Sequence, residues 1–218
     1  MLAVEAVLSN GDLVHLDSSI ADAPGPDLLG VLIGSEGTLA VVTKVTVRIL
    51  RRPEAVQTLL AAYDSVSAAG TAVSEIIAAG IIPAAVEIMD GVSLIAVEAA
   101  VHPNFPPAEA ILIVELDGPV AEVHEQFAQV EAICHRAGAT TVEVARDEAQ
   151  RARIWKGRKG AFASMGRVTP NYYVQDGVVP RTKLPEVLDR IRQLEARCGL
   201  RIGNVFHAGS CCIAAFEF

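Results

Sequence analysis

The chain has 218 residues, a formal net charge of −8 and a hydrophobic content of 51%. This content is ample for a packed core, but Gly and polar residues interrupt the longest apolar runs well short of a membrane span. We find no signal-peptide pattern after Met1. Four cysteines without C-x-x-C spacing indicate reduced thiols rather than a disulfide framework or a zinc site. We therefore expect a soluble, cytoplasmic protein without a transmembrane segment.

The charge is distributed unevenly along the chain. Residues 53–135 contain 12 Asp and Glu but no Lys or Arg, whereas residues 146–183 contain nine Lys and Arg against three Asp and Glu. A positive segment in an acidic protein attracts anions. The global charge and the lack of a recognition motif argue against nucleic acid, so a small anionic ligand fits better. A solvated helix face is the alternative, and the acidic segment could face a protein partner.

The first 52 residues read as strands and turns. Residues 2–8 and 13–16 flank Asn10-Gly11 and predict a β-hairpin. A long alternating run at residues 38–50 predicts a further strand. Pro53 then marks a boundary, because proline disfavours continuation of either a strand ladder or a helix.

The stretch Gly34-Ser35-Glu36-Gly37-Thr38 lies between this alternating run and a short apolar run at residues 28–33. On its own it is typical of a tight turn between two strands. Two glycines three residues apart also allow a backbone to approach a ligand closely, because neither carries a Cβ. The hydroxyls of Ser35 and Thr38 could bond a phosphate or a ring edge. Both interpretations stay open at this point.

Beyond Pro53, the patterns alternate as strand-helix-strand, twice. This order is the split βαβ plan, an antiparallel sheet with helices on one face. The expected strands are at residues 56–63, 84–89, 110–116 and 140–145, and the expected helices at 65–79, 91–101 and 119–137. Further along we expect a helix from 147 to about 162, a strand at 172–175 closed by Asp176-Gly177, a helix at 184–198 and a strand at 201–207.

Two residues stand out as candidates for chemistry. Arg158 lies on a predicted helix with Trp155 and Phe162, and a guanidinium beside an aromatic ring is a good clamp for a carboxylate. The alternative is that the rings are core residues and the bases face solvent. His207 ends a predicted strand, where a structural role is the common alternative to catalysis.

Several motifs, in this order, resemble those of FAD-linked oxidases and dehydrogenases of 2-hydroxy acids, the group that includes the glycolate oxidase flavin subunit and D-lactate dehydrogenase. The motifs are Gly34-Ser35-Glu36-Gly37-Thr38-Leu39-Ala40-Val41-Val42-Thr43, Glu115-Leu116-Asp117-Gly118, the helix from Trp155 to Phe162, Gln175-Asp176-Gly177-Val178-Val179-Pro180-Arg181 and Asn204-Val205-Phe206-His207-Ala208-Gly209. The resemblance extends from residue 1 to about residue 209.

The resemblance implies an α+β fold in two parts. Residues 1–52 would form the C-terminal part of a vanillyl-alcohol-oxidase-type FAD-binding domain. Residues 53–218 would form a truncated cap domain with a ferredoxin-like antiparallel sheet. It also implies that FAD lies against Gly34, Ser35, Glu36, Gly37 and Thr38, and against the backbone of Val42.

For the reaction, the resemblance implies that Arg158 holds the carboxylate of a small 2-hydroxy acid of the glycolate or D-lactate type. His207 matches the first His of a His-x-Gly-Asp-Gly-Asn-x-His motif that brings a divalent metal and a catalytic His to the substrate hydroxyl. The hydroxyl then loses its proton while hydride leaves carbon 2 for the flavin. Other oxidase subunits, including an iron-sulfur subunit, are implied as partners.

The sequence departs from the family pattern in two places. The glycine-rich loop that binds the FAD pyrophosphate has no counterpart in these residues, and Gly209 is followed by Ser210-Cys211-Cys212 instead of Asp-Gly-Asn-x-His. We therefore expect this chain by itself to retain little FAD and to show no turnover. The alternative to the enzyme is an inactive fragment or pseudo-enzyme that acts at most as a folding or interaction module.

Overall fold

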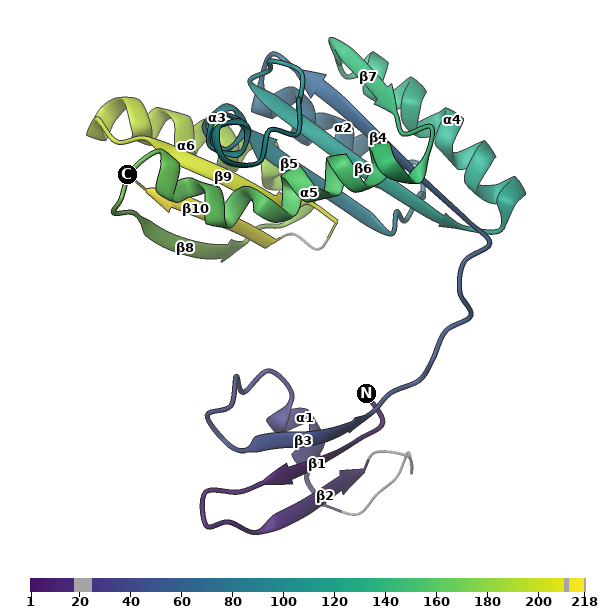
Figure 1. Ribbon diagram of the computed structural model, residues 1–218, viewed down its shortest axis with the longest axis vertical. Helices are drawn as coiled ribbons and strands as arrows, with labels where there is room; N and C mark the ends of the chain where they lie inside the picture. Colours follow the sequence, from purple (N-terminus) through teal and green to yellow (C-terminus); the bar gives the residue numbers. More distant parts are fainter. Residues whose placement is uncertain (18–24, 210–211, 218) are drawn as a thin grey trace. The chain divides into compact units, whose positions relative to one another are not determined.

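The computed structural model describes residues 1–17, 25–209 and 212–217 (Figure 1). The chain divides into two compact units, Met1–Arg52 and Pro53–Phe218, and the division falls immediately before Pro53. Each unit has its own sheet, and each is described here by itself.

The first unit contains a three-stranded sheet in the order β2-β1-β3. Its elements are β1 (Ala3–Val7), β2 (Leu13–Asp17), α1 (Leu28–Leu32) and β3 (Val41–Thr46). The predicted hairpin is confirmed, because β1 and β2 pair in antiparallel fashion. The Asn10 side chain closes the turn by accepting a hydrogen bond of 3.0 Å from the backbone N–H of Asp12.

The apolar run at residues 28–33 forms the short helix α1. The stretch from Gly34 to Thr38 is therefore not a turn between two strands, because the element before it is a helix. The carboxylate of Asp27 accepts a hydrogen bond of 2.9 Å from the backbone N–H of Gly30 and so caps the helix. Strand β3 is also shorter than the alternating run. It ends at Thr46, which pairs with Ala3 at the start of β1, so the residues that follow have no strand to pair with in the described chain.

The described residues of the second unit form a seven-stranded sheet in the order β7-β4-β6-β5-β9-β10-β8, with antiparallel neighbours. The strands are β4 (Ala55–Tyr63), β5 (Ala85–Asp90), β6 (Ala110–Gly118), β7 (Thr141–Val144), β8 (Tyr173–Val178), β9 (Ile202–His207) and β10 (Cys212–Glu217). The helices are α2 (Val66–Ala78), α3 (Gly91–Val101), α4 (Val120–Arg136), α5 (Glu148–Ser164) and α6 (Leu184–Cys198), with short 3-10 helices η1 (Met165–Arg167) and η2 (Arg181–Lys183).

The four strands β7, β4, β6 and β5 form two interleaved split βαβ units, as predicted. Strand β6 lies between β4 and β5, which α2 connects, and β4 lies between β6 and β7, which α4 connects. This is the strand order of a ferredoxin-like sheet. The strands β9, β10 and β8 extend it beyond β5.

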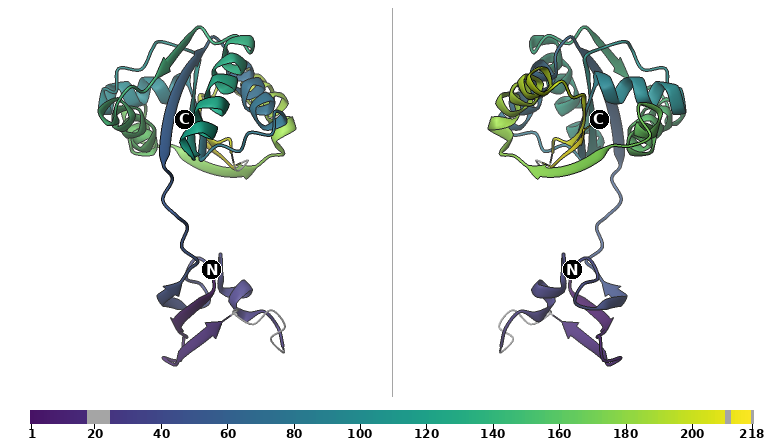
Figure 2. Two further views of the ribbon diagram at one scale, coloured as in Figure 1. Left: turned by 90° about the vertical axis from the view of Figure 1, so that its right-hand side faces the viewer. Right: turned by 90° about the vertical axis from the view of Figure 1, so that its left-hand side faces the viewer.

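The expectation that helices cover only one face of the sheet is wrong. Helices α2, α4 and α6 contribute to the hydrophobic core on one face, whereas α3 and α5 contribute to a second core on the other face (Figure 2). The central strands explain the difference. Neighbouring residues such as Leu59 and Leu60 of β4, or Ile111 and Leu112 of β6, are all buried although they point to opposite faces.

Strand β8 also differs from the prediction, because it continues through Asp176 and Gly177 instead of turning there. These two residues pair with Ala214 and Ile213 of β10. Strand β10 lies in the part of the sequence that departs from the family motif, and it pairs on its other side with β9. Cys211 lies outside the described residues.

Candidate functional site

Two candidate residues, Arg158 and His207, meet at a carboxylate that the sequence analysis did not single out. Glu87 of β5 lies opposite His207 of β9 in the strand register. One oxygen of Glu87, Oε1, lies 2.9 Å from Nδ1 of His207. The other oxygen, Oε2, accepts hydrogen bonds of 3.0 and 2.7 Å from Nε and Nη2 of Arg158 on α5. Three elements far apart in the chain therefore build one cluster.

The cluster is buried on one side and open on the other. The side chains of Glu87 and Arg158 are only 9% and 12% exposed, whereas that of His207 is 62% exposed. A buried ion pair of this kind is costly to break, because either partner alone would be an uncompensated buried charge. The imidazole is thus exposed to solvent, whereas the Glu87–Arg158 pair that it contacts is buried.

Glycines on α5 allow this helix to pack closely against its neighbours. A Cβ on Gly157 would come within 2.6 Å of Cε2 of Phe105, and a Cβ on Gly160 would come within 2.8 Å of a methyl group of Val101. Both distances are shorter than a carbon-carbon contact allows. The two glycines, on either side of Arg158, therefore let α5 lie close to α3 and to the loop around Phe105.

A second carboxylate anchors the first half of α5. Glu115 of β6 accepts two hydrogen bonds from Arg151, at 2.8 and 2.9 Å, and bonds of 2.6 Å from both the Trp155 indole and the Thr58 hydroxyl. Burial acts to raise the pKa of Glu115, but the hydrogen bonds from Arg151, Thr58 and Trp155 outweigh it and hold the pKa below 4.5. Trp155 is thus a hydrogen-bond donor as well as a half-buried ring.

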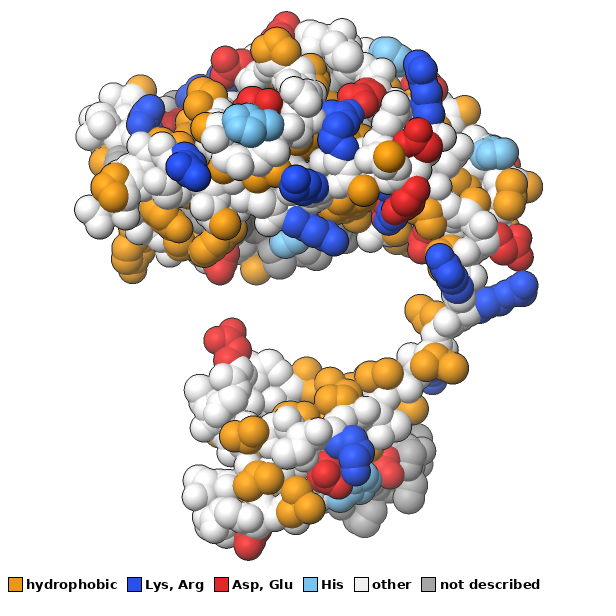
Figure 3. Space-filling view, viewed as in Figure 1, with side chains coloured by type: hydrophobic (Ala, Val, Ile, Leu, Met, Phe, Trp, Pro, Cys, Tyr) orange, Lys and Arg blue, Asp and Glu red, His pale blue; other side chains and the backbone are white. Residues whose placement is uncertain are grey.

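The positive segment is only partly a solvated helix face. Arg151 and Arg158 are engaged by Glu115 and Glu87, and Arg153 pairs with Glu143. Lys156 and Lys159 are exposed, and Figure 3 shows Lys and Arg side chains lying along the face on which α5 runs.

Several carboxylates of the acidic segment are likewise turned inward rather than toward a partner: Glu87, Asp90 and Glu115 are buried.

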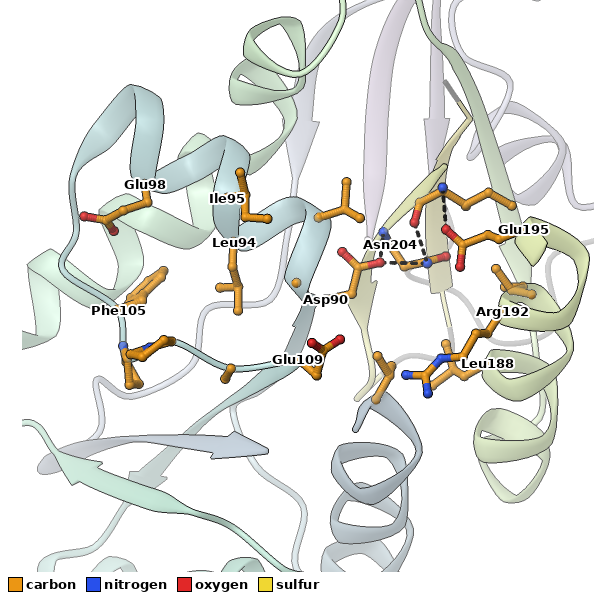
Figure 4. A pocket seen from close by; sticks show the side chains of 18 residues that line it. Asp90, Leu94, Ile95, Glu98, Phe105, Glu109, Leu188, Arg192, Glu195 and Asn204 are labelled. Atoms are coloured by element: carbon orange, nitrogen blue, oxygen red, sulfur yellow. Dashed lines mark hydrogen bonds between the residues drawn. The ribbon is translucent and has the colours of Figure 1, made fainter. Parts of the chain in front are cut away.

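A cavity of about 500 Å³ lies elsewhere in the second unit, between α3, α6 and the loop around Phe105 (Figure 4). Its ionisable lining consists of Asp90, Glu98, Glu109 and Glu195 against Arg192. An excess of carboxylates repels an anion, so this cavity is poorly suited to a 2-hydroxy acid. Neither Arg158 nor His207 lines it.

The glycine stretch of the first unit forms an exposed loop. Gly34 and Gly37 have φ values of +81° and +78°, and Glu36 between them has a φ of +50°. A Cβ on either glycine would meet no atom within 4 Å, so the space beside the loop is open. Within the described chain, the backbone N–H groups of Glu36 and Gly37 make no hydrogen bond. The loop can therefore offer backbone donors to a flavin, and it fits the predicted cofactor contact.

Thr38 and Val42 bear on that fit in opposite ways. The Thr38 hydroxyl donates a hydrogen bond of 2.6 Å to the carbonyl oxygen of Ser35, so its proton is already used within the loop. Val42 lies on β3, which is an edge strand of its sheet within the described residues. An edge strand has backbone groups without a strand partner, which agrees with a backbone contact from Val42 to the cofactor.

The predicted metal site at His207 does not fit the described residues as a complete site. No group of three or more His, Cys, Asp and Glu side chains suited to a metal ion occurs among them. Glu87 and His207 lie together, but Nδ1 of the imidazole is directed at the carboxylate rather than at a shared third point.

No helix in the described part of the chain is long and apolar enough to cross a membrane.

Comparison with known protein families shows which family the chain belongs to. The family described as "FAD linked oxidases, C-terminal domain" matches residues 52–215. The chain belongs to this family.

Two curated relatives of this chain are informative. It is 48% identical over 210 residues to the glycolate oxidase subunit GlcD of Escherichia coli K12, an alignment that covers 96% of this chain and 42% of the relative. It is 28% identical over 216 residues to the D-lactate dehydrogenase of Anaerostipes hadrus, covering 95% of this chain and 46% of that protein. The chain thus spans less than half the length of these relatives.

Among solved structures, the chain resembles 4-ethylphenol oxidase from Gulosibacter chungangensis. The TM-score is 0.70 at 13% sequence identity, and the match covers 99% of this chain and 50% of that protein. At this identity the likeness shows the fold alone, and it agrees with the α+β class predicted from the sequence.

Glu87 is the residue that sequence reasoning missed. It is a single acid within the apolar stretch Ala84-Ala85-Val86-Glu87-Ile88-Met89. An acid in an otherwise buried strand was the available signal, because a folded protein buries a carboxylate only where another group pairs with it. Its partners lie 71 and 120 residues further along the chain, so no local pattern could identify them.

Proposed function

We propose that this chain forms the substrate-binding part, and one portion of the flavin-binding part, of an FAD-dependent oxidoreductase. The substrate is a small 2-hydroxy acid of the glycolate or D-lactate type, oxidised by hydride transfer to the flavin. The observation that carries the proposal is that Arg158 and His207 both contact Glu87, in a cluster whose Glu87–Arg158 pair is buried and whose imidazole is exposed. Family membership and the two curated relatives support it.

Arg158 binds the substrate carboxylate in this proposal. Its Nε and one hydrogen of Nη2 are used by Glu87, while Nη1 makes no hydrogen bond with another described residue. A guanidinium offers five N–H donors, so those not directed at Glu87 remain for the ligand. Because Glu87 balances the charge, recognition depends on directed hydrogen bonds more than on net attraction.

His207 accepts the proton of the substrate hydroxyl. Its imidazole is exposed, lies beside Arg158 with Nδ1 3.5 Å from Nη2, and so is close enough to act on the hydroxyl next to a bound carboxylate. FAD, when bound, supplies the acceptor for the hydride that leaves carbon 2.

We assign residues 1–52 to the FAD-binding domain and residues 53–218 to the cap domain. The residues that would hold FAD are Gly34, Ser35, Glu36, Gly37, Thr38 and Val42, supported by the open loop with its unpaired backbone donors. Because the similar GlcD protein is named as a subunit, we also propose further oxidase subunits as partners, an iron-sulfur subunit among them.

A binding titration tests the substrate assignment. Glycolate and D-lactate are added to the purified chain, with acetate as a ligand that lacks the 2-hydroxyl group. We expect the hydroxy acids to bind more tightly than acetate, and Arg158→Gln to weaken them at least tenfold. The matched control is Arg153→Gln, which removes a charge from the same helix but pairs with Glu143 instead. Equal affinity of wild type and Arg158→Gln, or no binding by wild type, would overturn the assignment.

A non-catalytic interaction module is the second candidate. All six residues of β3 are exposed, including Val41 at 65%, so the first unit presents an apolar sheet surface that is suited to a protein partner. Substrate binding separates the candidates. Binding of a 2-hydroxy acid that depends on Arg158 supports the enzyme part, whereas a folded chain that binds no hydroxy acid supports the module.

A further inference from the structure

We propose that the cavity between α3, α6 and the loop around Phe105 binds a small linear diamine, with one ammonium group on the side of Glu98 and the other on the side of Asn204. The cavity measures about 500 Å³, a size suited to a small organic ligand. Neither Arg158 nor His207 lines it. This ligand is therefore separate from the 2-hydroxy acid of the proposed function.

Carboxylates dominate the ionisable lining of the cavity. Four of them stand against one guanidinium, which gives a net charge of −3 when every group is ionised: Asp90, Glu98, Glu109 and Glu195 against Arg192. The side chains of Glu98, Glu109 and Arg192 make no ion pair or hydrogen bond with another described residue. A ligand with two positive charges compensates most of this charge, whereas an anion would add to it.

An amide oxygen of the lining lacks a hydrogen-bond donor. Asn204 is 6% exposed, and its Nδ2 donates to Oδ2 of Asp90 at 2.8 Å and to the carbonyl oxygen of Ile202 at 3.4 Å. A carbonyl oxygen can only accept, so these contacts fix which end of the amide is the nitrogen. Oδ1 is the remaining atom, and within the described chain it is buried without a partner. A ligand N–H in the cavity would supply the missing donor.

A second buried oxygen without a donor belongs to the opposite side of the cavity. Oε2 of Glu98 on α3 has no hydrogen-bond partner among the described residues. Figure 4 shows Glu98 at one side of the cavity and Asn204, Glu195 and Arg192 at the other. A ligand that satisfies both oxygens therefore needs a donor group at each of its ends.

Helix α3 sets the length of this ligand. Asp90 caps the helix and Glu98 lies eight residues further along it, so their backbone positions are about 12 Å apart along the axis. Leu94 and Ile95 lie between them on the same helix and line the cavity. An extended six-carbon diamine spans roughly 9 Å between its nitrogens, and a hydrogen bond of about 2.9 Å at each end covers the remaining distance. Its methylene groups then lie against the apolar side chains.

An NMR titration of the purified chain with 1,6-diaminohexane, at a pH of about 7 and low ionic strength, tests the proposal. We expect saturable shifts of the backbone amide signals of Glu98, Glu109 and Asn204. Hexylamine lacks one ammonium group and should bind at least about threefold more weakly, and 1,6-hexanediol lacks both charges and should bind at least about tenfold more weakly. Equal affinity of the diamine and the diol, shifts confined to other residues, or no saturation would overturn the proposal.

A shorter diamine tests the two-ended arrangement. 1,3-Diaminopropane carries the same two charges but cannot reach both sides of the cavity. We expect it to bind at least about fivefold more weakly than 1,6-diaminohexane, because only one of its ammonium groups finds an acceptor at a time. Equal affinities of the two diamines would show that the ligand contacts one side alone, and would overturn the assignment.

Two variants remove one carboxylate from each side of the cavity without changing the size of the side chain. Glu98→Gln loses no described partner, and the amide oxygen in Glu195→Gln can still accept the hydrogen bond from the backbone N–H of Ile202. Each should weaken 1,6-diaminohexane about fivefold. Glu125→Gln on α4 is the matched control, because it removes the same charge from an exposed position that does not line the cavity. Wild-type affinity in both lining variants, or an equal loss in the control, would overturn the proposal.

Discussion

Asp90 and Asn204 tie the end of β5 to β9 across 114 residues of sequence. Oδ2 of Asp90 accepts hydrogen bonds of 2.6 Å from the backbone N–H of Asn204 and 2.8 Å from its side-chain amide. Oδ1 accepts a third bond, of 2.9 Å, from the backbone N–H of Ser93 and so caps α3. Burial nevertheless dominates these hydrogen bonds and raises the pKa of Asp90 to about 6.

Stability should therefore fall as pH rises through the range in which Asp90 ionises. The ordinary pKa is 3.8 and the folded value is higher, so the folded state holds the proton more tightly. The stabilisation from this proton is complete below pH 3.8 and is lost as pH rises through about 6. A shift of about two pKa units corresponds to about 3 kcal/mol.

Urea unfolding followed by the fluorescence of Trp155, the single tryptophan of the chain, measures this effect in the second unit. Asp90→Asn cannot ionise, so we expect the difference in unfolding free energy between variant and wild type to change by about 3 kcal/mol across this pH range. The absolute stability of the variant does not enter the comparison. A constant difference from pH 4 to pH 7 would show that Asp90 does not titrate in this range.

Glu115→Ala should lower the unfolding free energy by about 3 kcal/mol, because it leaves Arg151, Trp155 and Thr58 without their shared acceptor. Glu75→Ala is the matched control. It removes a carboxylate from an exposed pair with Arg136, and such pairs contribute less than about 1 kcal/mol.

The pKa of Glu115 is lowered, so its contribution is present above pH 4.5 and is lost as pH falls through the folded value. We expect the two alanine variants to converge in stability under strongly acidic conditions. Similar losses in both variants at neutral pH would mean that the buried cluster has no special role.

Gly157→Ala should destabilise the second unit by about 1–2 kcal/mol, although alanine is the better helix former by about 1 kcal/mol. The added methyl group would overlap the ring of Phe105 and push α5 away from its neighbours. Gly166→Ala is the control, because its Cβ would meet nothing within 4 Å and we expect a change within about 0.5 kcal/mol. A Gly157→Ala protein as stable as wild type would contradict the close packing of this helix.

FAD titrated into the chain should shift the backbone amide signals of the loop from Gly34 to Thr38 more than those elsewhere in the first unit. Gly37→Ala should reduce these shifts, since a Cβ there occupies the open space beside the loop and strains a backbone with φ of +78°. Gly11→Ala imposes a similar strain, at φ of +90°, in the β1–β2 turn and serves as the control. Uniform shifts, or equal effects of both substitutions, would count against a flavin contact at this loop.

Local patterns were sufficient for most elements. The bounds of α3 and α6 agree with the prediction, and the hairpin at Asn10-Gly11 was correct. These features depend on interactions between residues close in sequence, such as helical periodicity and turn geometry. The family motifs also placed Arg158 and His207 among the candidate residues before any contact between them was known.

The sequence by itself therefore determined the α+β class, the split βαβ order and two members of the candidate site. Only the tertiary structure decided that helices cover both faces of the sheet, that β8 continues to pair with β10, and that Glu87 joins Arg158 to His207. The physical reason is that the role of a buried carboxylate depends on the groups that contact it. Its charge can persist only where strand register and helix packing bring a cation and an imidazole to it, and both depend on contacts between distant parts of the chain.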